Sequence, residues 1–204
     1  MKQKFSETIK IPEGVVCVFE SNILKCKKDN IELERNIDIF PAELKIDSNE
    51  IRIECSSASR KEIKYIRTFI AHIKNLFLGL NRKFIYHLES ASVHFPMTLK
   101  IEGSKITINN FLGEKIPRIA RILPNVDVEI KGNQIVVSSY NKESAGQTAA
   151  NLEKATKIKK RDRRIFQDGI YITSKASSKF SDSEEENRKW ERDLSGKIQK
   201  DILR

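Results

Sequence analysis

The feature that most restricts the fold of this chain is an order of segments that occurs twice. Pro12 corresponds to Pro96, and Asn49 corresponds to Asn133, at an offset of 84 residues in both pairs (96 − 12 and 133 − 49). In each copy, short strand-like segments are followed by one helical stretch. An internal duplication accounts for this order, and chance agreement between generic strand-turn-helix sequences is the alternative. The duplication predicts two similar domains in tandem.

The spacing of apolar residues predicts strands first and then a helix in each domain. Cys17 and Phe19 alternate with polar residues, which is typical of a sheet with one solvated face. From Ser59 the apolar residues recur every three or four positions, which predicts a helix over residues 59–80, with Ser59 and Glu62 as its capping box. Such a helix needs a sheet to cover its apolar face. We therefore expect an α+β fold, in which each domain has a mostly antiparallel sheet with one helix packed on a face.

In the second copy we expect strands at residues 97–101, 105–110, 118–122, 126–131 and 134–138, and a helix at about 142–156. The apolar face of this helix consists mainly of small residues such as Ala145 and Ala149, so its docking should bury less area than that of the first helix. We therefore expect the segment after it to complete the core through four apolar residues: Ile165, Phe166, Ile170 and Tyr171.

The chain divides into three parts by composition. We expect a first α+β domain at residues 1–92, a second at residues 93–175, and a C-terminal extension at residues 176–204. The extension begins with a serine-rich linker, and Trp190, Leu194 and Ile198 then recur at every fourth residue. This spacing predicts a tail helix at about 184–202 that becomes ordered only on a partner, and the alternative is a mobile charged tail.

Positive charge is concentrated in the second domain. The chain has a net charge of +10. Residues 93–175 hold 15 basic and 8 acidic groups, whereas residues 1–92 hold 16 and 13. Between residues 154 and 164, seven basic residues are interrupted by one acid, Asp162. A run of this kind is often only a solvated face, but the apolar residues beside it indicate cations fixed at set spacings that attract a polyanion such as RNA. The candidate RNA-binding residues are Lys115, Arg118, Arg121, Lys154, Lys157, Lys159, Lys160, Arg161, Arg163, Arg164 and Lys175.

Motifs for catalysis, cofactors and metals are absent from the sequence. The three histidines are scattered, and neither a phosphate-cradling glycine loop nor a metal-ligand spacing occurs. Cys17, Cys26 and Cys55 match neither a zinc site nor a redox pair by spacing, so we interpret them as small buried residues on strands. No apolar run could cross a membrane, and no signal peptide is present, so the expected compartment is the cytosol. The absence of an aromatic RNA-recognition pattern and of a G-x-x-G clamp favours structured RNA as the target.

Several strings of residues resemble one known family. Residues 164–171 read R-I-F-Q-D-G-I-Y, residues 94–96 read H-F-P, and residues 110–115 read N-F-L-G-E-K. Together with Arg60-Lys61-Glu62 and His72 on the first helix, they resemble large-subunit ribosomal protein six in the bacterial count, nine in the eukaryotic count, in its archaeal and eukaryotic branch. The resemblance covers about residues 5–175, and the extension after residue 175 departs from it.

The resemblance implies a structural protein of the large ribosomal subunit in the cytoplasm, without catalytic activity, cofactor, membrane contact or small-molecule substrate. It implies two tandem α+β domains, of which the second binds large-subunit rRNA near the sarcin–ricin loop and the site of translational GTPases. Neighbouring ribosomal proteins are possible partners of the tail around Trp190. Two alternatives from other classes are a free RNA-processing or RNA-modifying enzyme with a basic binding domain, and a protein-interaction adaptor that acts through the tail.

Overall fold

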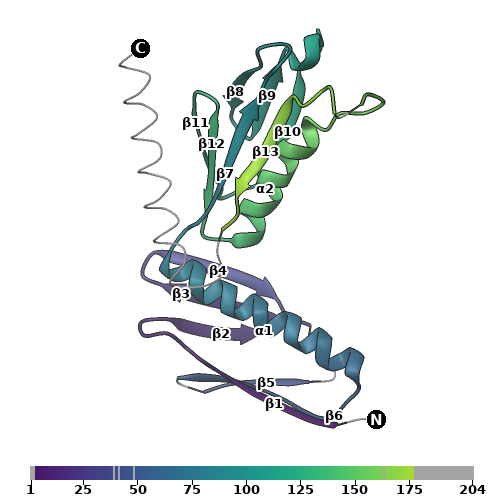
Figure 1. Ribbon diagram of the computed structural model, residues 1–204. Coiled ribbons are helices and arrows are strands. Elements are labelled where there is room, and N and C mark those ends of the chain that lie inside the picture. Colours follow the sequence, from purple (N-terminus) through teal and green to yellow (C-terminus); the bar gives the residue numbers. More distant parts are fainter. Residues whose placement is uncertain (1–2, 39, 41, 48, 163, 177–204) are drawn as a thin grey trace.

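The computed structural model describes residues 3–38, 40, 42–47, 49–162 and 164–176, and these residues form an α+β fold with two sheet-plus-helix halves (Figure 1). The two halves lie one above the other, and β7 passes from one to the other (Figure 1). This arrangement confirms the two-part α+β fold expected from the repeat. The tail helix expected at residues 184–202, with Trp190, lies outside the described residues.

The first half contains two three-stranded antiparallel sheets and one helix, in the part of the chain described. The sheets have the strand orders β1-β6-β5 and β2-β3-β4. The elements are β1 (Gln3–Lys10), β2 (Val16–Glu20), β3 (Ile23–Lys28), β4 (Ile31–Asn36), β5 (Glu43–Ile46), β6 (Glu50–Ala58) and α1 (Arg60–Asn81). The predicted capping box is present: Ser59 accepts a hydrogen bond from the Glu62 amide, and the Glu62 side chain bonds back to Ser59. The helix therefore begins where its sequence predicts.

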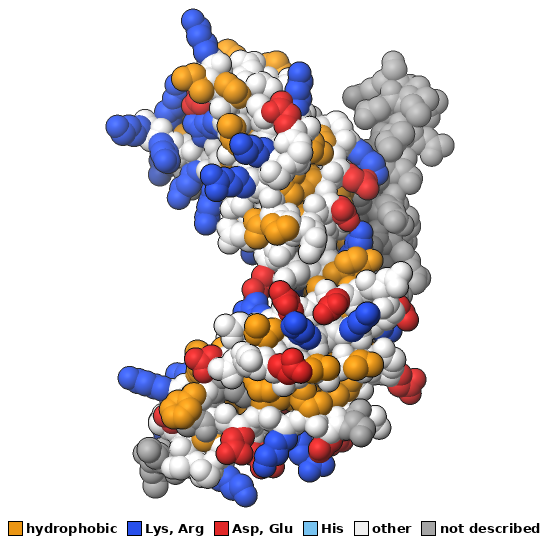
Figure 2. Space-filling model, turned by 180° about the vertical axis from the view of Figure 1, so that it is seen from behind, with side chains coloured by type: hydrophobic (Ala, Val, Ile, Leu, Met, Phe, Trp, Pro, Cys, Tyr) orange, Lys and Arg blue, Asp and Glu red, His pale blue; other side chains and the backbone are white. Residues whose placement is uncertain are grey.

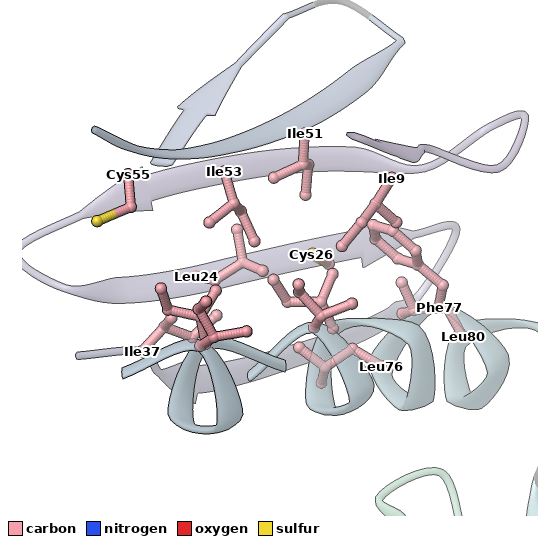
Figure 3. Packing of buried hydrophobic residues seen from close by; sticks show 14 of the residues in the cluster. Ile9, Leu24, Cys26, Ile37, Ile51, Ile53, Cys55, Leu76, Phe77 and Leu80 are labelled. Carbon is pink, nitrogen blue, oxygen red and sulfur yellow. The ribbon is translucent and has the colours of Figure 1, made fainter. Parts of the chain in front are cut away.

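The core of the first half lies where both sheets meet α1. Figure 3 shows Ile51 and Ile53 of β6 and Leu24 of β3 turned toward a layer closed by Phe77 and Leu80 of α1. Ile51, Ile53 and Leu24 are fully buried. The single sheet expected beneath the helix is thus two sheets whose apolar faces share one core.

The second half repeats this plan with one additional strand. Its sheets have the orders β11-β12-β7-β13 and β10-β9-β8, again antiparallel throughout. The elements are β7 (Phe84–Ala91), β8 (Thr98–Glu102), β9 (Lys105–Asn109), a short 3-10 turn η1 (Phe111–Gly113), β10 (Arg118–Arg121), β11 (Asp127–Lys131), β12 (Gln134–Ser139), α2 (Lys142–Ala155) and β13 (Gly169–Ser174). The orders β1-β6-β5 and β7-β12-β11 correspond, as do β2-β3-β4 and β8-β9-β10. This correspondence supports the internal duplication.

The strand β7 belongs to the second half by its hydrogen bonds. It lies between β12 and β13, with Val137 opposite Tyr86 and Ile170 opposite Ser90. The sequence pattern placed this strand in residues 1–92, because it follows the first helix directly. In the duplicated plan β7 is the counterpart of β1, so the second copy of the plan begins at Phe84.

The helix α2 packs closely on its sheets because its buried face consists mainly of small side chains. Ala145, Ala149 and Leu152 are fully buried, and the helix lies against β10, β12, β13 and β7. Gly146 permits a close approach to β7, since a methyl group there would lie 3.0 Å from the Tyr86 hydroxyl oxygen. The small residues thus give α2 contact with four strands.

A polar junction joins the two halves. Arg35 of β4 forms an ion pair with Glu143 of α2, and His72 Nδ1 of α1 lies 3.1 Å from the same carboxylate. Burial and the neighbouring Arg35 lower the pKa of His72, although Glu143 partly opposes this. At Gly79, inside α1, a methyl group would lie 2.2 Å from the Tyr140 carbonyl oxygen. Gly79 therefore permits close contact between the two halves.

Candidate nucleic-acid interface

The candidate surface is built around residues 157–168, here called the basic loop, which connect α2 to β13. Asp162, the one acid between residues 154 and 164, shapes this loop. Its carboxylate accepts a hydrogen bond from the Arg164 amide at 2.9 Å, and its carbonyl oxygen accepts from the Phe166 amide at 3.0 Å. Lys160 adopts a left-handed backbone conformation with φ of 58°. Asp162 is therefore a turn residue that fixes the course of the backbone in the basic loop.

Thr156 anchors the start of the basic loop to its end. Its buried hydroxyl accepts a hydrogen bond from the Ile170 amide at 2.8 Å, at the start of β13. The same hydroxyl lies 3.4 Å from the Leu152 carbonyl oxygen in the last turn of α2. Thr156, the residue just after α2, is thus bonded to the second residue of β13, so both ends of the loop are attached to the folded body.

Asp168 attaches the end of the basic loop to the segment after β7. Its carboxylate accepts hydrogen bonds from the amides of Val93 and His94 at 2.7 and 3.0 Å, and from the His94 ring at 2.7 Å. Burial alone would raise the pKa of Asp168, but these hydrogen bonds together lower the pKa below its ordinary value. Asp168 is therefore a buried carboxylate that holds two segments together.

The apolar anchors expected next to the basic run are only partly present. Ile170 is fully buried, as predicted, but the side chain of Ile165 is 63% exposed and that of Tyr171 is 37% exposed. Phe166 is half-buried: its ring lies 5.0 Å from the His94 ring, and the Arg161 guanidinium lies 4.9 Å from its centroid. The prediction that these four residues complete the core is wrong for three of them. Thr156 and Asp168 provide polar attachment instead.

Arg118 is held by internal contacts. Its guanidinium forms two hydrogen bonds with the Glu114 carboxylate, at 2.7 and 2.6 Å, and donates to the carbonyl oxygens of Ala155 and Lys157 at 2.9 and 3.3 Å. It also lies 4.2 Å from the centroid of the buried Phe111 ring. The hydrogen bonds from Arg118 lower the pKa of Glu114. Arg118 thus caps the C-terminal end of α2 and positions the basic loop.

The remaining candidate cations that the structure describes are exposed, and most of them lie on one side of the second half. In Figure 2, Lys and Arg side chains gather on the left of the upper half, with few acidic side chains among them, whereas basic and acidic side chains alternate on the lower half. This is the side on which Figure 1 shows α2 and the basic loop. The exposed candidates are Lys115, Arg121, Lys154, Lys157, Lys159, Lys160, Arg161, Arg164 and Lys175.

Two candidates stand apart from this group. Lys175 follows β13 at the end of the strand away from the basic loop (Figure 1). Arg163 lies outside the described residues. We call the exposed cations without Lys175 the basic surface: Lys115, Arg121, Lys154, Lys157, Lys159, Lys160, Arg161 and Arg164. The structure thus joins β10 and its preceding loop, the end of α2 and the basic loop into one region.

The histidines do not form a common site. His72 faces Glu143 at the junction, His87 lies on β7, and His94 is bonded to Asp168. The cavity beside His72 has a volume of about 20 Å³, which fits a water molecule rather than a substrate. Within the ranges that the structure describes, no cluster of three or more histidine, cysteine or acidic residues could hold a metal ion. Among the same residues, no helix is long and apolar enough to cross a membrane.

Comparison with known proteins gives the family. Residues 95–169 match the model of the family described as Ribosomal protein L6. The chain is 42% identical over 176 residues to the large ribosomal subunit protein uL6 of Methanosarcina mazei, covering 86% of this chain and 100% of that relative. The chain belongs to the uL6 family. A second uL6 relative, from Methanobrevibacter smithii, is 42% identical over 174 residues, covering 83% of this chain and 95% of its own length.

Membership of the uL6 family confirms several predictions made from the sequence. The protein is a structural constituent of the large ribosomal subunit, where it functions in translation in the cytoplasm, and it is not an enzyme. The alternative of a free RNA-processing or RNA-modifying enzyme is therefore wrong. The matched residues, 95–169, include β8 to β12, α2 and the whole of the basic loop.

Proposed function

We propose that the second half binds large-subunit rRNA through the basic surface. The observation that carries this proposal is that exposed cations of the basic loop are attached to the fold at both ends, by Thr156 and Asp168. Cations held at set spacings can match a particular arrangement of phosphates, and less conformational entropy is lost on binding than with a flexible basic segment. Lys and Arg bind phosphate as a point charge and as a planar fork, respectively.

We propose further that the bound rRNA is the region beside the sarcin–ricin loop, near where translational GTPases dock. This part of the proposal rests on the likeness of residues 94–96, 110–115 and 164–171 to the ribosomal family. By this proposal the protein acts as a fixed block of positive charge that holds crowded rRNA helices together. By this proposal the candidate residues are of two kinds. Most of them contact phosphate, whereas others, such as Arg118, hold the phosphate-contacting residues in position.

The salt dependence of binding tests the role of the basic surface. Affinity for an rRNA fragment that carries the sarcin–ricin loop should fall linearly with salt on a log–log plot, with a slope of about −0.7 to −0.9 for each phosphate that a cation neutralises. Replacing Lys157, Lys159, Lys160 and Arg164 by Gln should flatten this slope by about that amount for each phosphate that is no longer neutralised. An unchanged slope would contradict the proposal.

A matched variant controls for net charge. Four lysines are exposed on the first half: Lys10, Lys25, Lys27 and Lys45. Replacing them by Gln removes the same number of positive charges as the test variant does. We expect this variant to keep the slope nearly unchanged, because its cations lie outside the basic surface. Equal flattening by both variants would mean that binding depends on net charge alone. A duplex RNA of the same length without the loop tests the choice of rRNA element.

A further inference from the structure

We propose that Cys17 and Cys26 form a reversible intramolecular dithiol–disulfide pair, with hydrogen peroxide or a similar two-electron oxidant as its co-reactant. This site lies in the first half and is independent of the proposed rRNA binding. The two cysteines are directly opposite each other on the neighbouring antiparallel strands β2 and β3. Their sulfur atoms are 2.9 Å apart. The sequence spacing gave no indication of this pair, because the contact depends on the register of the hairpin.

The strand register makes a disulfide geometrically accessible. Directly opposed residues of an antiparallel pair have Cα atoms about 4.5–5.5 Å apart. Disulfides connect Cα atoms that are about 4.4–6.8 Å apart. Cys17 and Cys26 therefore need only side-chain adjustment to form the bond, and the backbone of β2 and β3 can stay in place.

The two thiols are unequal in a way that favours ordered oxidation. Cys17 is half-buried on β2, whereas Cys26 is fully buried on the central strand β3. A hydrogen bond from the Cys26 thiol lowers the pKa of Cys17, although burial partly opposes the effect. The same contact and burial raise the pKa of Cys26. Since the thiolate is the reactive form, Cys17 is the sulfur that reacts with peroxide, and Cys26 is the resolving sulfur that then forms the disulfide.

The chemistry balances in two steps. The Cys17 thiolate attacks one peroxide oxygen, an S–O bond forms, the O–O bond breaks, and the departing hydroxide takes up a proton to become water. This leaves Cys17 as a sulfenic acid. The Cys26 sulfur then attacks the Cys17 sulfur, the S–S bond forms, the S–O bond breaks, and the hydroxyl leaves as water with the Cys26 proton. The two sulfurs lose two electrons, which the peroxide gains.

The third cysteine provides an internal reference. Cys55 lies on β6, a strand of the other sheet, and Figure 3 shows it toward one end of the core, on a different strand from Cys26. Cys55 is buried, like Cys26, so burial alone would give both residues the same low reactivity. A disulfide that joins Cys17 to Cys26 and omits Cys55 would reflect the cross-strand geometry.

Peptide mapping of the oxidised full chain tests the proposal without any mutation. The reduced protein is treated with hydrogen peroxide, unreacted thiols are alkylated under denaturing conditions, and the peptides are identified by mass. We expect a monomer that has lost two hydrogens, a Cys17–Cys26 cross-linked peptide, and alkylated Cys55, with full reversal by dithiothreitol. Bonds between chains, bonds to Cys55, or over-oxidised Cys17 with Cys26 still alkylated would overturn the proposal.

Variants test the order of the two steps. Cys26→Ala should leave Cys17 as a sulfenic acid that a sulfenic-acid-specific probe captures, and Cys17 should react with iodoacetamide more slowly than in the native chain because its hydrogen-bond donor is lost. Cys55→Ala should form the disulfide as the native chain does. Circular dichroism establishes that each variant is folded. Labelling of Cys26 rather than Cys17 by the probe in the native chain would contradict the proposed roles.

Discussion

Arg118 and Lys159 both carry positive charge in the second half, but their surroundings give them different roles. The Arg118 guanidinium is bonded to Glu114 and to the backbone at the end of α2, and its side chain is 27% exposed. Lys159 is exposed on the basic loop. Composition and charge runs indicate how many cations a region has, but hydrogen-bond partners decide which of them can reach a phosphate.

Replacing Arg118 by Gln should destabilise the second half and leave the salt slope of rRNA binding unchanged. The loss of hydrogen bonds to two backbone carbonyls and of the cation–π interaction with Phe111 should reduce the free energy of unfolding by about 1–3 kcal/mol. Arg121 is the matched control, since it is exposed on the same strand. Arg121→Gln should change stability by less than about 0.5 kcal/mol and should flatten the salt slope. Urea unfolding and binding titrations measure both effects, and the reverse pattern would contradict these roles.

Asp168 should make the stability of the protein depend on pH in the acid range. The folded protein lowers the pKa of Asp168 below the unfolded value of about 3.9. The stability that this carboxylate contributes is therefore present above that value and is lost as pH falls through the lower folded pKa.

Asp168→Asn should remove this contribution, because an amide NH₂ cannot accept the hydrogen bond from the His94 ring. At pH 5 we expect the variant to be less stable than the native chain by about 1–3 kcal/mol. The difference should shrink as pH falls below about 3.9 and through the lower folded pKa of the native carboxylate. Urea unfolding at several pH values measures it, and a difference that does not change with pH would count against the role of the charged form.

At the scale of elements, the end of α2 and the start of β13 determine the position of the basic loop. Within residues 3–176, the strands and the two helices predicted from the sequence agree with the observed ones, because period-two and period-3.6 patterns reflect which face is buried. The attachment of the loop could not be predicted in this way. Thr156 and Asp168 are polar residues whose partners, Ile170 and His94, are set by tertiary structure. The sequence therefore suggested apolar anchors where polar ones occur.

Thr156→Val should detach one end of the basic loop. Valine has almost the same shape but cannot accept the hydrogen bond from the buried Ile170 amide, so we expect a loss of about 1–3 kcal/mol in the free energy of unfolding. Thr156→Ser keeps the acceptor and should cost less. Hydrogen exchange of the Ile170 amide reports directly on this bond, and exchange should be faster in the valine variant only. Equal protection in both variants would show that Thr156 does not hold the loop.

At the scale of the molecule, the two halves share one plan of strands and helix, and the second half begins directly after the helix of the first. The strand β7 follows α1 directly and pairs with β12 and β13, so the second sheet incorporates residues that the sequence assigned to the first domain. Periodicity located this strand without identifying its partners, because strand pairing is a long-range property. The same limit applies to the junction, where Arg35, His72 and Glu143 meet from three different elements.

Gly79→Ala should weaken the junction. In an ordinary helix interior this change stabilises by about 0.8–1.0 kcal/mol. Here the new methyl group would lie 2.2 Å from the Tyr140 carbonyl oxygen, so the halves must shift, and we expect a net loss of about 1–3 kcal/mol. Thr68→Ala, at an exposed position of the same helix, is the control and should have little effect. Thermal unfolding and small-angle X-ray scattering measure stability and overall dimensions, and a Gly79→Ala protein more stable than the native chain would contradict the close contact.

The central claim is that the basic surface of the second half faces rRNA in the assembled subunit. Electron cryomicroscopy of the large subunit that contains this chain tests it most directly, through the distances from Lys157, Lys159, Lys160 and Arg164 to the nearest phosphate oxygens. We predict that most of these side chains lie within hydrogen-bonding distance of rRNA phosphates beside the sarcin–ricin loop, while Arg118 stays on Glu114 and the end of α2. Side chains of the basic loop that face solvent or protein, with rRNA bound to another side of the second half, would contradict the claim.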